Sequence, residues 1–308
     1  MVLTTEWQLL SHPVLCKFQH QLWICQIQSQ DPQVSGNKAL KLKYQLAQAV
    51  QTKNAGLLTL GGAFSNHLAA TAAACHSLGL ASIGLVRTDA IDLGNPTLSA
   101  CQQNGMQLIA VSREHYRQRD HLEWQQHWQM QFPDYLFVPE GGTSEAAVRA
   151  VSEFPLGQTP AGQADCLVSA VGSGGTLAGL IRGAGSASVL GIQVAPDPGL
   201  SNKISRLTEG ATDNWQLQPA LHLPAYGKVD NTLWEFCALM KQQGIELEPI
   251  YTGKALYNLL LLIEQGLLGQ GKRISFFHTG GLQGLAGLAY RGLIPSADFG
   301  QSNAPVAG

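Results

Sequence analysis

The sequence predicts an α/β protein with parallel sheets, because short apolar runs alternate with longer helical stretches over most of the chain. The clearest series begins at Ala55, with strands expected at 56–60, 81–86, 107–111 and 135–138. Helices are expected after these strands, at 65–78, 96–104, 120–131 and 144–154. Strands that alternate with helices in this way form a parallel sheet with helices on both faces.

A second α/β series follows residues 157–164, a stretch rich in Gly, Pro and Gln that we interpret as a crossover between two domains. Its strands are expected at 166–171, 189–194, 245–248 and 274–278, and its helices near 176, at 251–266 and at 282–290. With 308 residues the chain exceeds the usual size of one hydrophobic core, which also favours two domains. The tail after Pro295 is expected to be loose.

The composition indicates a globular enzyme, with 45% hydrophobic and 13% charged residues. The net charge is −2 and no basic block occurs, so no nucleic-acid partner is expected. The sequence also lacks a membrane-spanning apolar run and a signal peptide, so we expect a cytoplasmic protein without a membrane partner. The six cysteines form no CxxC pair, so neither a metal site nor a disulfide framework is expected. Four of them lie in apolar surroundings and are expected to be buried: Cys75, Cys101, Cys166 and Cys237.

Three short segments carry residues suited to cofactor chemistry. Lys38 lies in Gly36-Asn37-Lys38, where a turn is expected to open a helix, and glycine-bearing segments follow at 61–67 and 172–176. A lysine amine can form a Schiff base with an aldehyde, and a glycine loop at a helix start can hold a phosphate. One amine, one polar loop and one anion cradle are the groups that hold pyridoxal phosphate. Taken singly, the segments also fit a surface lysine, an N-capping serine and a tight strand-to-helix turn.

Two other phosphate motifs are excluded by single residues. A dinucleotide fingerprint starting at Gly172 would need glycine where Leu177 stands. A nucleotide P-loop starting at Gly266 would need Ser or Thr where Arg273 stands. Since glycine loops follow expected strands at 61–62, 172–175 and 280–281, we expect the site at the carboxyl ends of the strands.

In their order along the chain, these motifs resemble the fold-type-II pyridoxal-phosphate enzymes. Within that group they are similar to the D-cysteine desulfhydrase and 1-aminocyclopropane-1-carboxylate deaminase family. The resemblance runs from about Ser35 to Gly281 and includes Tyr226-Gly227, the segment 249–254 and the segment 278–281. It implies two open, twisted parallel-sheet domains of the tryptophan synthase β type, with the active site between them. Residues 1–50 and 156–308 would form the larger, cofactor-binding domain and residues 51–155 the smaller one.

The resemblance also implies roles for individual residues. Lys38 would be the Schiff-base lysine and the catalytic base, Asn66 would lie near the pyridine ring, and Thr252 would lie beside the ring nitrogen. The phosphate of pyridoxal 5'-phosphate would be held by Gly172, Ser173, Gly174, Gly175 and Thr176. The substrate would be bound by Ser65, Asn66, His67, Thr279 and Gly280, with its carboxylate at the first three. Tyr226 and Tyr251 would flank the substrate, and the alternatives for a second catalytic proton donor are Tyr251, Tyr226 and Ser65.

Three positions favour the desulfhydrases over the deaminases. Thr252, Thr279 and His67 stand where the deaminases typically carry Glu, Leu and Gln. A hydroxyl beside the pyridine nitrogen leaves the ring largely neutral and makes it a weaker electron sink than a carboxylate would. A thiolate leaves readily and tolerates the weaker sink, whereas the opening of a cyclopropane ring needs the stronger one.

We therefore expect a pyridoxal-phosphate-dependent lyase that catalyses α,β-elimination on a small amino acid. D-Cysteine, giving pyruvate, ammonia and hydrogen sulfide, is favoured. The alternatives are a 1-aminocyclopropane-1-carboxylate deaminase, a D-serine dehydratase or other β-eliminase, a racemase or β-replacement enzyme of the same fold, and a non-catalytic cofactor-binding relative. The chain departs from the family at Leu40, at 25–31 and at Lys228-Val229, which leaves the substrate identity open. A homodimer is implied by the resemblance.

Overall fold

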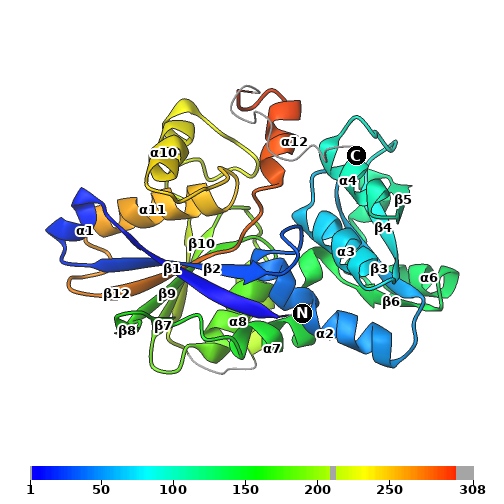
Figure 1. Ribbon diagram of the computed structural model, residues 1–308, viewed down its shortest axis with the longest axis horizontal. Helices are drawn as coiled ribbons and strands as arrows, with labels where there is room; N and C mark the ends of the chain where they lie inside the picture. Colours follow the sequence, from blue (N-terminus) through cyan, green and yellow to red (C-terminus); the bar gives the residue numbers. More distant parts are fainter. Residues whose placement is uncertain (1, 209–212, 296–308) are drawn as a thin grey trace, which may run out of the picture.

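The computed structural model describes residues 2–208 and 213–295 and contains two main sheets, one in each half of the molecule (Figure 1). The larger sheet has the strand order β1-β2-β12-β9-β10-β11. Its strands are β1 (Leu3–Leu10), β2 (Gln21–Ser29), β9 (Cys166–Val171), β10 (Ser188–Gln193), β11 (Trp215–Pro219) and β12 (Arg273–His278). The smaller sheet has the order β5-β4-β3-β6, from β3 (Gly56–Gly62), β4 (Ala81–Arg87), β5 (Met106–Val111) and β6 (Tyr135–Val138).

Helices cover both faces of each sheet. One face of the larger sheet packs against α1 (Pro13–Lys17), α10 (Asn231–Gln242) and α11 (Thr252–Glu264), and the other against α7 (Glu145–Ser152), α8 (Gly175–Gly183) and α9 (Leu200–Thr208). The smaller sheet lies between α3 (Asn66–Ser77) with α4 (Pro96–Gln103) on one face and α5 (Arg113–Tyr116) with α6 (Leu122–Gln131) on the other. The remaining elements are α2 (Gly36–Gln51), the turn η1 (Glu140–Gly142), the hairpin β7 (Gln158–Thr159) and β8 (Gly162–Gln163), and α12 (Gly284–Tyr290).

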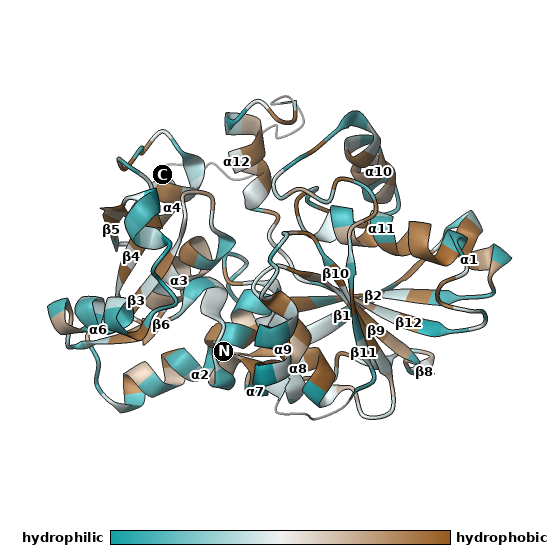
Figure 2. Ribbon diagram, turned by 180° about the vertical axis from the view of Figure 1, so that it is seen from behind, coloured by the Kyte–Doolittle hydropathy of each residue, from teal (hydrophilic) through white to brown (hydrophobic). Residues whose placement is uncertain are grey.

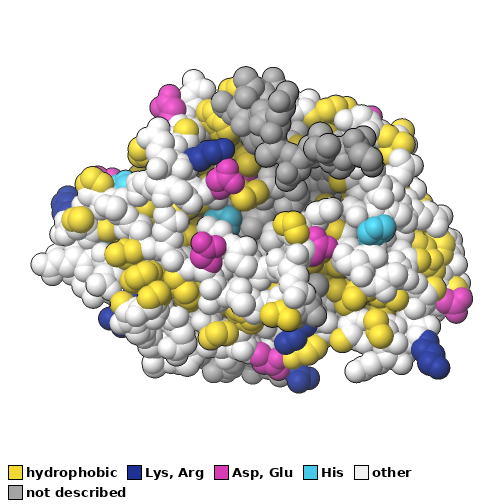
Figure 3. Space-filling view, in the orientation of Figure 1, with side chains coloured by type: hydrophobic (Ala, Val, Ile, Leu, Met, Phe, Trp, Pro, Cys, Tyr) yellow, Lys and Arg dark blue, Asp and Glu magenta, His cyan; other side chains and the backbone are white. Residues whose placement is uncertain are grey.

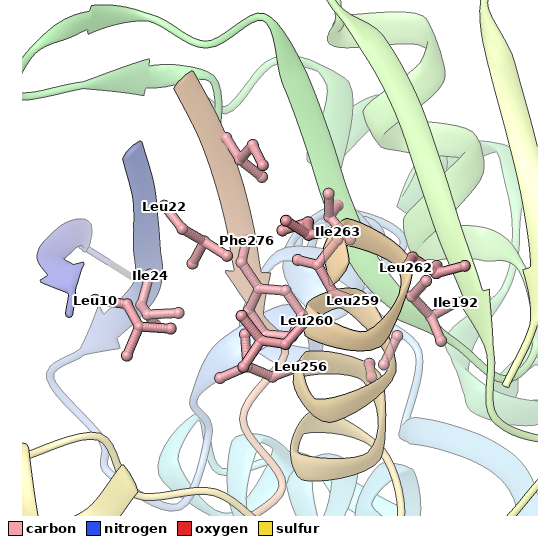
Figure 4. Packing of buried hydrophobic residues seen from close by; sticks show 14 of the residues in the cluster. Leu10, Leu22, Ile24, Ile192, Leu256, Leu259, Leu260, Leu262, Ile263 and Phe276 are labelled. Atoms are coloured by element: carbon pink, nitrogen blue, oxygen red, sulfur yellow. The ribbon is translucent and has the colours of Figure 1, made fainter. Parts of the chain in front are cut away.

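The core of the larger half lies between its sheet and α11. All six residues of β9 are buried, as expected for a central parallel strand that is covered on both faces. Leu256, Leu259 and Leu260 of α11 point toward Phe276 of β12, and Leu262 lies near Ile192 of β10 (Figure 4). The hydropathy view shows α11 as one of the most apolar helices, as this burial requires (Figure 2).

Two helices connect the halves. Helix α2 packs residues such as Leu42 and Ala49 into the core of the smaller half, while Leu40 packs into the core of the larger half. Helix α12 follows β12 of the larger sheet and packs against α4 of the smaller half (Figure 1). There the Tyr290 hydroxyl donates a hydrogen bond of 2.6 Å to Asp92.

The structure confirms the α/β class and most of the expected elements, whose ends differ by a few residues at most. One expected strand is wrong, because residues 245–248 form no strand. Ile245 and Leu247 are buried there, but the next residue, Glu248, uses its carboxylate to cap α11, so the segment turns instead of pairing. The larger sheet is also not purely parallel, because β1 pairs antiparallel with β2 at its edge.

Several other expectations can be compared with the structure. The four cysteines expected to be buried are buried. No helix in the described ranges has both the length and the apolar character needed to span a bilayer. The expected loose tail lies outside the described residues. The domain boundaries remain a prediction, although the smaller sheet takes all its strands from residues 56–138.

Candidate active site

The carboxyl ends of strands from both sheets meet at the start of α2. The chain approaches itself closely at Gly36, where a Cβ atom would lie 2.3 Å from the carbonyl oxygen of Thr279. Gly36 has φ of +61°, which side-chain-bearing residues rarely adopt. The Asn37 N–H donates to the same Thr279 carbonyl at 3.2 Å. The turn that opens α2 is therefore held against the loop that follows β12.

Lys38 points from this turn toward the smaller half. Its Nζ donates a hydrogen bond of 3.1 Å to the carbonyl of Gly141, in the turn that follows β6. Burial lowers the pKa of Lys38 to about 8, while the negative charge of Glu140 opposes this shift. Near neutral pH, an amine with this pKa is unprotonated in a fraction of the molecules. The unprotonated form is the one that acts as a nucleophile or as a general base.

An anion cradle lies beside Lys38, at the start of α8. Gly174, the residue before this helix, has φ of 87°, and no side chain caps the first turn. The free N–H groups of that turn and the positive end of the helix dipole therefore favour an anion. A Cβ atom on Gly175 would lie 2.9 Å from Thr143 Oγ1 and 3.1 Å from Lys41 Nζ, so only glycine leaves this space open.

Hydroxyl and amine groups surround the cradle. Thr143 Oγ1 and Ser173 Oγ lie 2.7 Å apart, and the buried Lys41 amine donates to Thr143 at 3.0 Å. The side-chain amide of Asn37 donates to Thr176 Oγ1 at 2.9 Å. Burial, together with the positive charge of Lys38, holds the pKa of Lys41 well below its ordinary value. A bound phosphate would compensate these donors, so the residues present fit the phosphate end of pyridoxal phosphate.

The second helix start in the site belongs to α3. Ser65 Oγ accepts hydrogen bonds from the backbone N–H groups of His67 and Leu68, at 3.2 and 3.3 Å. The hydroxyl keeps its own proton and can donate it to a carboxylate at this helix start. The side chain of Asn66 lies against the loop after β12, since a Cβ atom on Gly281 would approach Asn66 Nδ2 to 2.6 Å.

His67 lies beneath the site and is only 2% exposed. Its Nε2 is 2.7 Å from Thr59 Oγ1, and that hydroxyl donates to the Val138 carbonyl at 2.8 Å. Nε2 is therefore the protonated ring nitrogen, and burial holds the pKa of His67 well below its ordinary value. Its ring packs against Gly142, where a Cβ atom would lie 3.0 Å from Cε1. The structure thus places His67 against the Gly141-Gly142 turn.

Two tyrosines from the larger half lie near the phosphate loop. The Tyr251 hydroxyl donates to the Tyr226 hydroxyl at 3.1 Å, and a Cβ atom on Gly172 would lie 3.1 Å from the Tyr251 ring. Burial raises the pKa of Tyr251 well above its ordinary value, so this phenol stays protonated. Tyr226 is 52% exposed, and its segment is held by the Lys254 amine, which donates to the Ala225 carbonyl at 2.9 Å.

Thr252 is fully buried at the start of α11, and its partner is Glu248. The Thr252 N–H donates to Glu248 Oε1 at 2.7 Å, and the Thr252 hydroxyl lies 3.2 Å from the same oxygen. The N–H groups of Ile250 and Tyr251 also donate to this carboxylate, at 2.8 and 2.9 Å. Burial raises the pKa of Glu248 to about 7 despite these bonds. The structure therefore places the Thr252 hydroxyl within a capped turn. Its expected contact with the pyridine nitrogen of pyridoxal phosphate remains a prediction.

The structure brings together the residues predicted at Lys38, at 65–67, at 172–176, at Tyr226, at Tyr251 and at 279–280. Thr252 follows Tyr251 in the chain, and its hydroxyl lies against Glu248. It adds four that the sequence argument left out: Lys41, Thr143, Glu140 and Gly141. Lys41 lies one helical turn after Lys38, and this spacing was a usable signal. The segment Glu140-Gly141-Gly142 directly follows a strand, and two of its residues are glycines, which also marked a loop at the sheet edge.

Comparison with known proteins decides the family. The model of the family described as "Pyridoxal-phosphate dependent enzyme" matches residues 19–280. The chain belongs to this family. Pyridoxal phosphate is accordingly its cofactor, and the two-sheet architecture is that of the fold-type-II enzymes.

Individual relatives indicate which branch of this family the chain is similar to. The bifunctional D-cysteine desulfhydrase/1-aminocyclopropane-1-carboxylate deaminase of Arabidopsis thaliana is 30% identical over 86% of this chain and 73% of its own length. A D-cysteine desulfhydrase of Klebsiella pneumoniae is 27% identical over 82% and 84% of the two chains. A crystal structure described as an ACC deaminase homologue is 26% identical, covers 94% of both chains and has a TM-score of 0.77. The protein is therefore a pyridoxal-phosphate-dependent lyase of the deaminase and desulfhydrase family.

Proposed function

We propose that this pyridoxal-phosphate enzyme eliminates hydrogen sulfide from D-cysteine, and that water hydrolyses the remaining unsaturated amino acid to pyruvate and ammonia. The observation that carries the proposal is the contact of the Lys38 amine with the Gly141 carbonyl. On one side Gly141 lies against Ser173, just before the uncapped start of α8, and on the other Gly142 lies against His67, in the first turn of the Ser65-capped α3. Such an arrangement suits a cofactor phosphate on one side and a substrate carboxylate on the other.

Each group of residues has a defined task in this proposal. Gly172, Ser173, Gly174, Gly175 and Thr176 would hold the cofactor phosphate together with Lys41. Lys38 would hold the cofactor covalently. Asn66 would face the pyridine ring, while Ser65, the N–H groups of α3, Thr279 and Gly280 would bind the substrate. The buried His67 supports substrate binding indirectly, because its ring packs against the Gly141-Gly142 turn.

Bound pyridoxal phosphate withdraws electrons from the substrate Cα, which makes the α-proton acidic. The Lys38 amine would accept that proton as a general base when it is not bonded to the cofactor. The Cβ–S bond then breaks, and the electron pair leaves with the sulfur. Tyr251 stays protonated and is hydrogen-bonded to Tyr226, so this pair can donate a proton to the departing thiolate. Ser65 remains the alternative donor.

The preference for sulfur over a cyclopropane ring rests on Thr252, Thr279 and His67, which resemble the desulfhydrase pattern. The hydroxyl of Thr252 carries no charge, so the cofactor ring would be a weaker electron sink than one facing a carboxylate. The alternative activity is that of a 1-aminocyclopropane-1-carboxylate deaminase, which the Arabidopsis thaliana relative combines with desulfhydrase activity in its name.

Replacement of Lys38 by Ala tests the proposal. We expect loss of the visible absorption of the covalently held cofactor and a fall in sulfide release of at least about 10³-fold, because nucleophile and base are removed together. Lys43, an exposed lysine on the same helix, supplies the control variant Lys43→Ala, which should keep both properties.

The substrate is decided by parallel assays with D-cysteine, L-cysteine, D-serine and 1-aminocyclopropane-1-carboxylate. Pyruvate and sulfide should form fastest from D-cysteine. Faster 2-oxo acid formation from the cyclopropane substrate would assign the deaminase activity instead. A wild type that takes up no pyridoxal phosphate would remove the basis of the proposal.

A further inference from the structure

A carboxylate lies directly beside the acceptor of the Lys38 amine. Glu140 opens the turn after β6, and Gly141, whose carbonyl accepts the hydrogen bond from Lys38, is the next residue. Gly141 and Gly142 have φ of 66° and 69°, a conformation that glycine adopts at little cost. The two glycines therefore let the turn present its carbonyl to the amine, and Glu140 is the residue directly before that carbonyl.

Both oxygens of the Glu140 carboxylate are held by residues from the region of α5. The Tyr116 hydroxyl donates to Oε1 at 2.8 Å, and Arg119 Nε donates to Oε2 at 2.5 Å. Tyr116 is itself fixed, being 1% exposed and flanked by the guanidinium groups of Arg87 and Arg119, at 5.7 and 5.3 Å from its ring centre. Two charge-assisted bonds therefore hold the carboxylate in one position relative to α5.

The electrostatic surroundings make this carboxylate important for Lys38. The negative charge of Glu140 raises the pKa of the Lys38 amine and so opposes the effect of burial. The same charge raises the pKa of Tyr251, on the opposite side of the site. Titratable and charged groups surround the amine from five elements or their ends. They are Lys41 on α2, His67 on α3, Glu140 on η1, Tyr251 before α11, and Tyr116, Arg119 and Asp120 at α5. The space-filling view shows Asp and Glu side chains on both sides of the hollow between the halves (Figure 3).

We propose that Glu140 is a positioning residue that stabilises the protonated Lys38 amine, and so sets the ease with which this amine takes up and returns the α-proton. The proposal rests on the proposed function, in which Lys38 becomes an ammonium group after it accepts that proton. Glu140 acts through its charge at a distance and touches neither cofactor nor substrate in this role. Arg119 limits the effect, because its positive charge partly neutralises the same carboxylate.

The test measures how fast the full chain, freed of cofactor, takes up pyridoxal phosphate at a series of pH values. Only the unprotonated amine reacts with the aldehyde, so the rate should rise with pH through the pKa of Lys38. In Glu140→Gln, we expect this rise to move to lower pH by roughly one unit, which makes uptake about tenfold faster below the midpoint. In Arg119→Gln, the Glu140 carboxylate loses the positive charge that partly neutralises it. The rise of the uptake rate should therefore move to higher pH.

The control is Glu145→Gln, which removes an exposed carboxylate that is paired with Arg182 on the surface of α7. This variant should leave the pH profile unchanged. An unchanged profile in Glu140→Gln would overturn the proposal, and so would shifts of the same sign in the Glu140 and Arg119 variants, since a purely structural network predicts equal signs. Uptake by the wild type is a separate readout, and its absence would instead contradict the proposed function.

Discussion

The two helix starts that meet at Lys38 differ in how their first turns are satisfied. Helix α8 begins after Gly174 in a left-handed conformation and has no side-chain cap. Helix α3 begins after Ser65, whose hydroxyl accepts hydrogen bonds from two backbone N–H groups. Both starts have the same dipole and the same position at a carboxyl sheet edge, so the cap is the difference between them.

This difference indicates which ligand each helix start is built for. An uncapped turn leaves its N–H groups unsatisfied until an anion arrives, so α8 depends on a permanently bound group such as the cofactor phosphate. A capped turn is stable alone and offers a single hydroxyl proton, which suits a substrate that comes and goes. The first two of the following three predictions test this difference between α8 and α3.

The largest effect is expected from Gly175→Ala. The new methyl group would approach Thr143 Oγ1 and Lys41 Nζ to about 3 Å and fill the space for a phosphate oxygen, without any strained φ at this position. We expect the dissociation constant of pyridoxal phosphate to rise by about 100-fold, measured by equilibrium titration, because at least one charge-assisted hydrogen bond is lost. Gly199→Ala, where the nearest atom lies at 3.4 Å, should bind the cofactor normally. Equal affinity in both variants would show that α8 does not hold the phosphate.

A smaller and different effect is expected from Ser65→Ala. The variant should bind pyridoxal phosphate as tightly as the wild type, whereas KM for the amino acid should rise by roughly tenfold because a carboxylate donor is lost. Loss of the cap should also cost about 1 kcal/mol of stability. Ser112→Ala, which removes the cap of α5, separates the two effects, because it should lose stability without a change in KM. A weaker affinity for cofactor in Ser65→Ala would break the proposed division.

The third prediction concerns stability alone and Glu248, the carboxylate that caps α11. Its pKa is raised from 4.5 to about 7, so the folded protein binds its proton more tightly than the unfolded chain does. The resulting stability is fully present below pH 4.5 and is lost as the pH rises through about 7. Compared with Glu248→Gln, which cannot titrate, the wild type should lose about 3 kcal/mol over this range. Urea unfolding at several pH values measures the difference, and parallel curves for the two proteins would refute it.

The sequence was informative where function depends on local pattern. Glycine at 172, 174 and 175 follows an apolar strand, and Lys38 lies at a turn before an amphipathic helix, so these features could be predicted from neighbouring residues. Thr143 and Glu140 could not, because each acts on a lysine about 100 residues away that only the folded chain brings near it. The strand expected at 245–248 failed for a local reason: its buried Ile and Leu resemble a strand, while Glu248 caps the helix that begins four residues later.

The contact between Gly36 and Thr279 has a consequence for the order of folding. It joins backbone near the first helix of the site to backbone that follows the last strand of the larger sheet, and the Asn37 N–H is bonded across it. A contact between such distant parts of a chain forms late, because the entropy cost of closing a long loop comes before the contact can stabilise the fold. The turn that presents Lys38 is therefore completed only when β12 has been added to the sheet. A growing chain on the ribosome can complete this turn only after Thr279 has been synthesised.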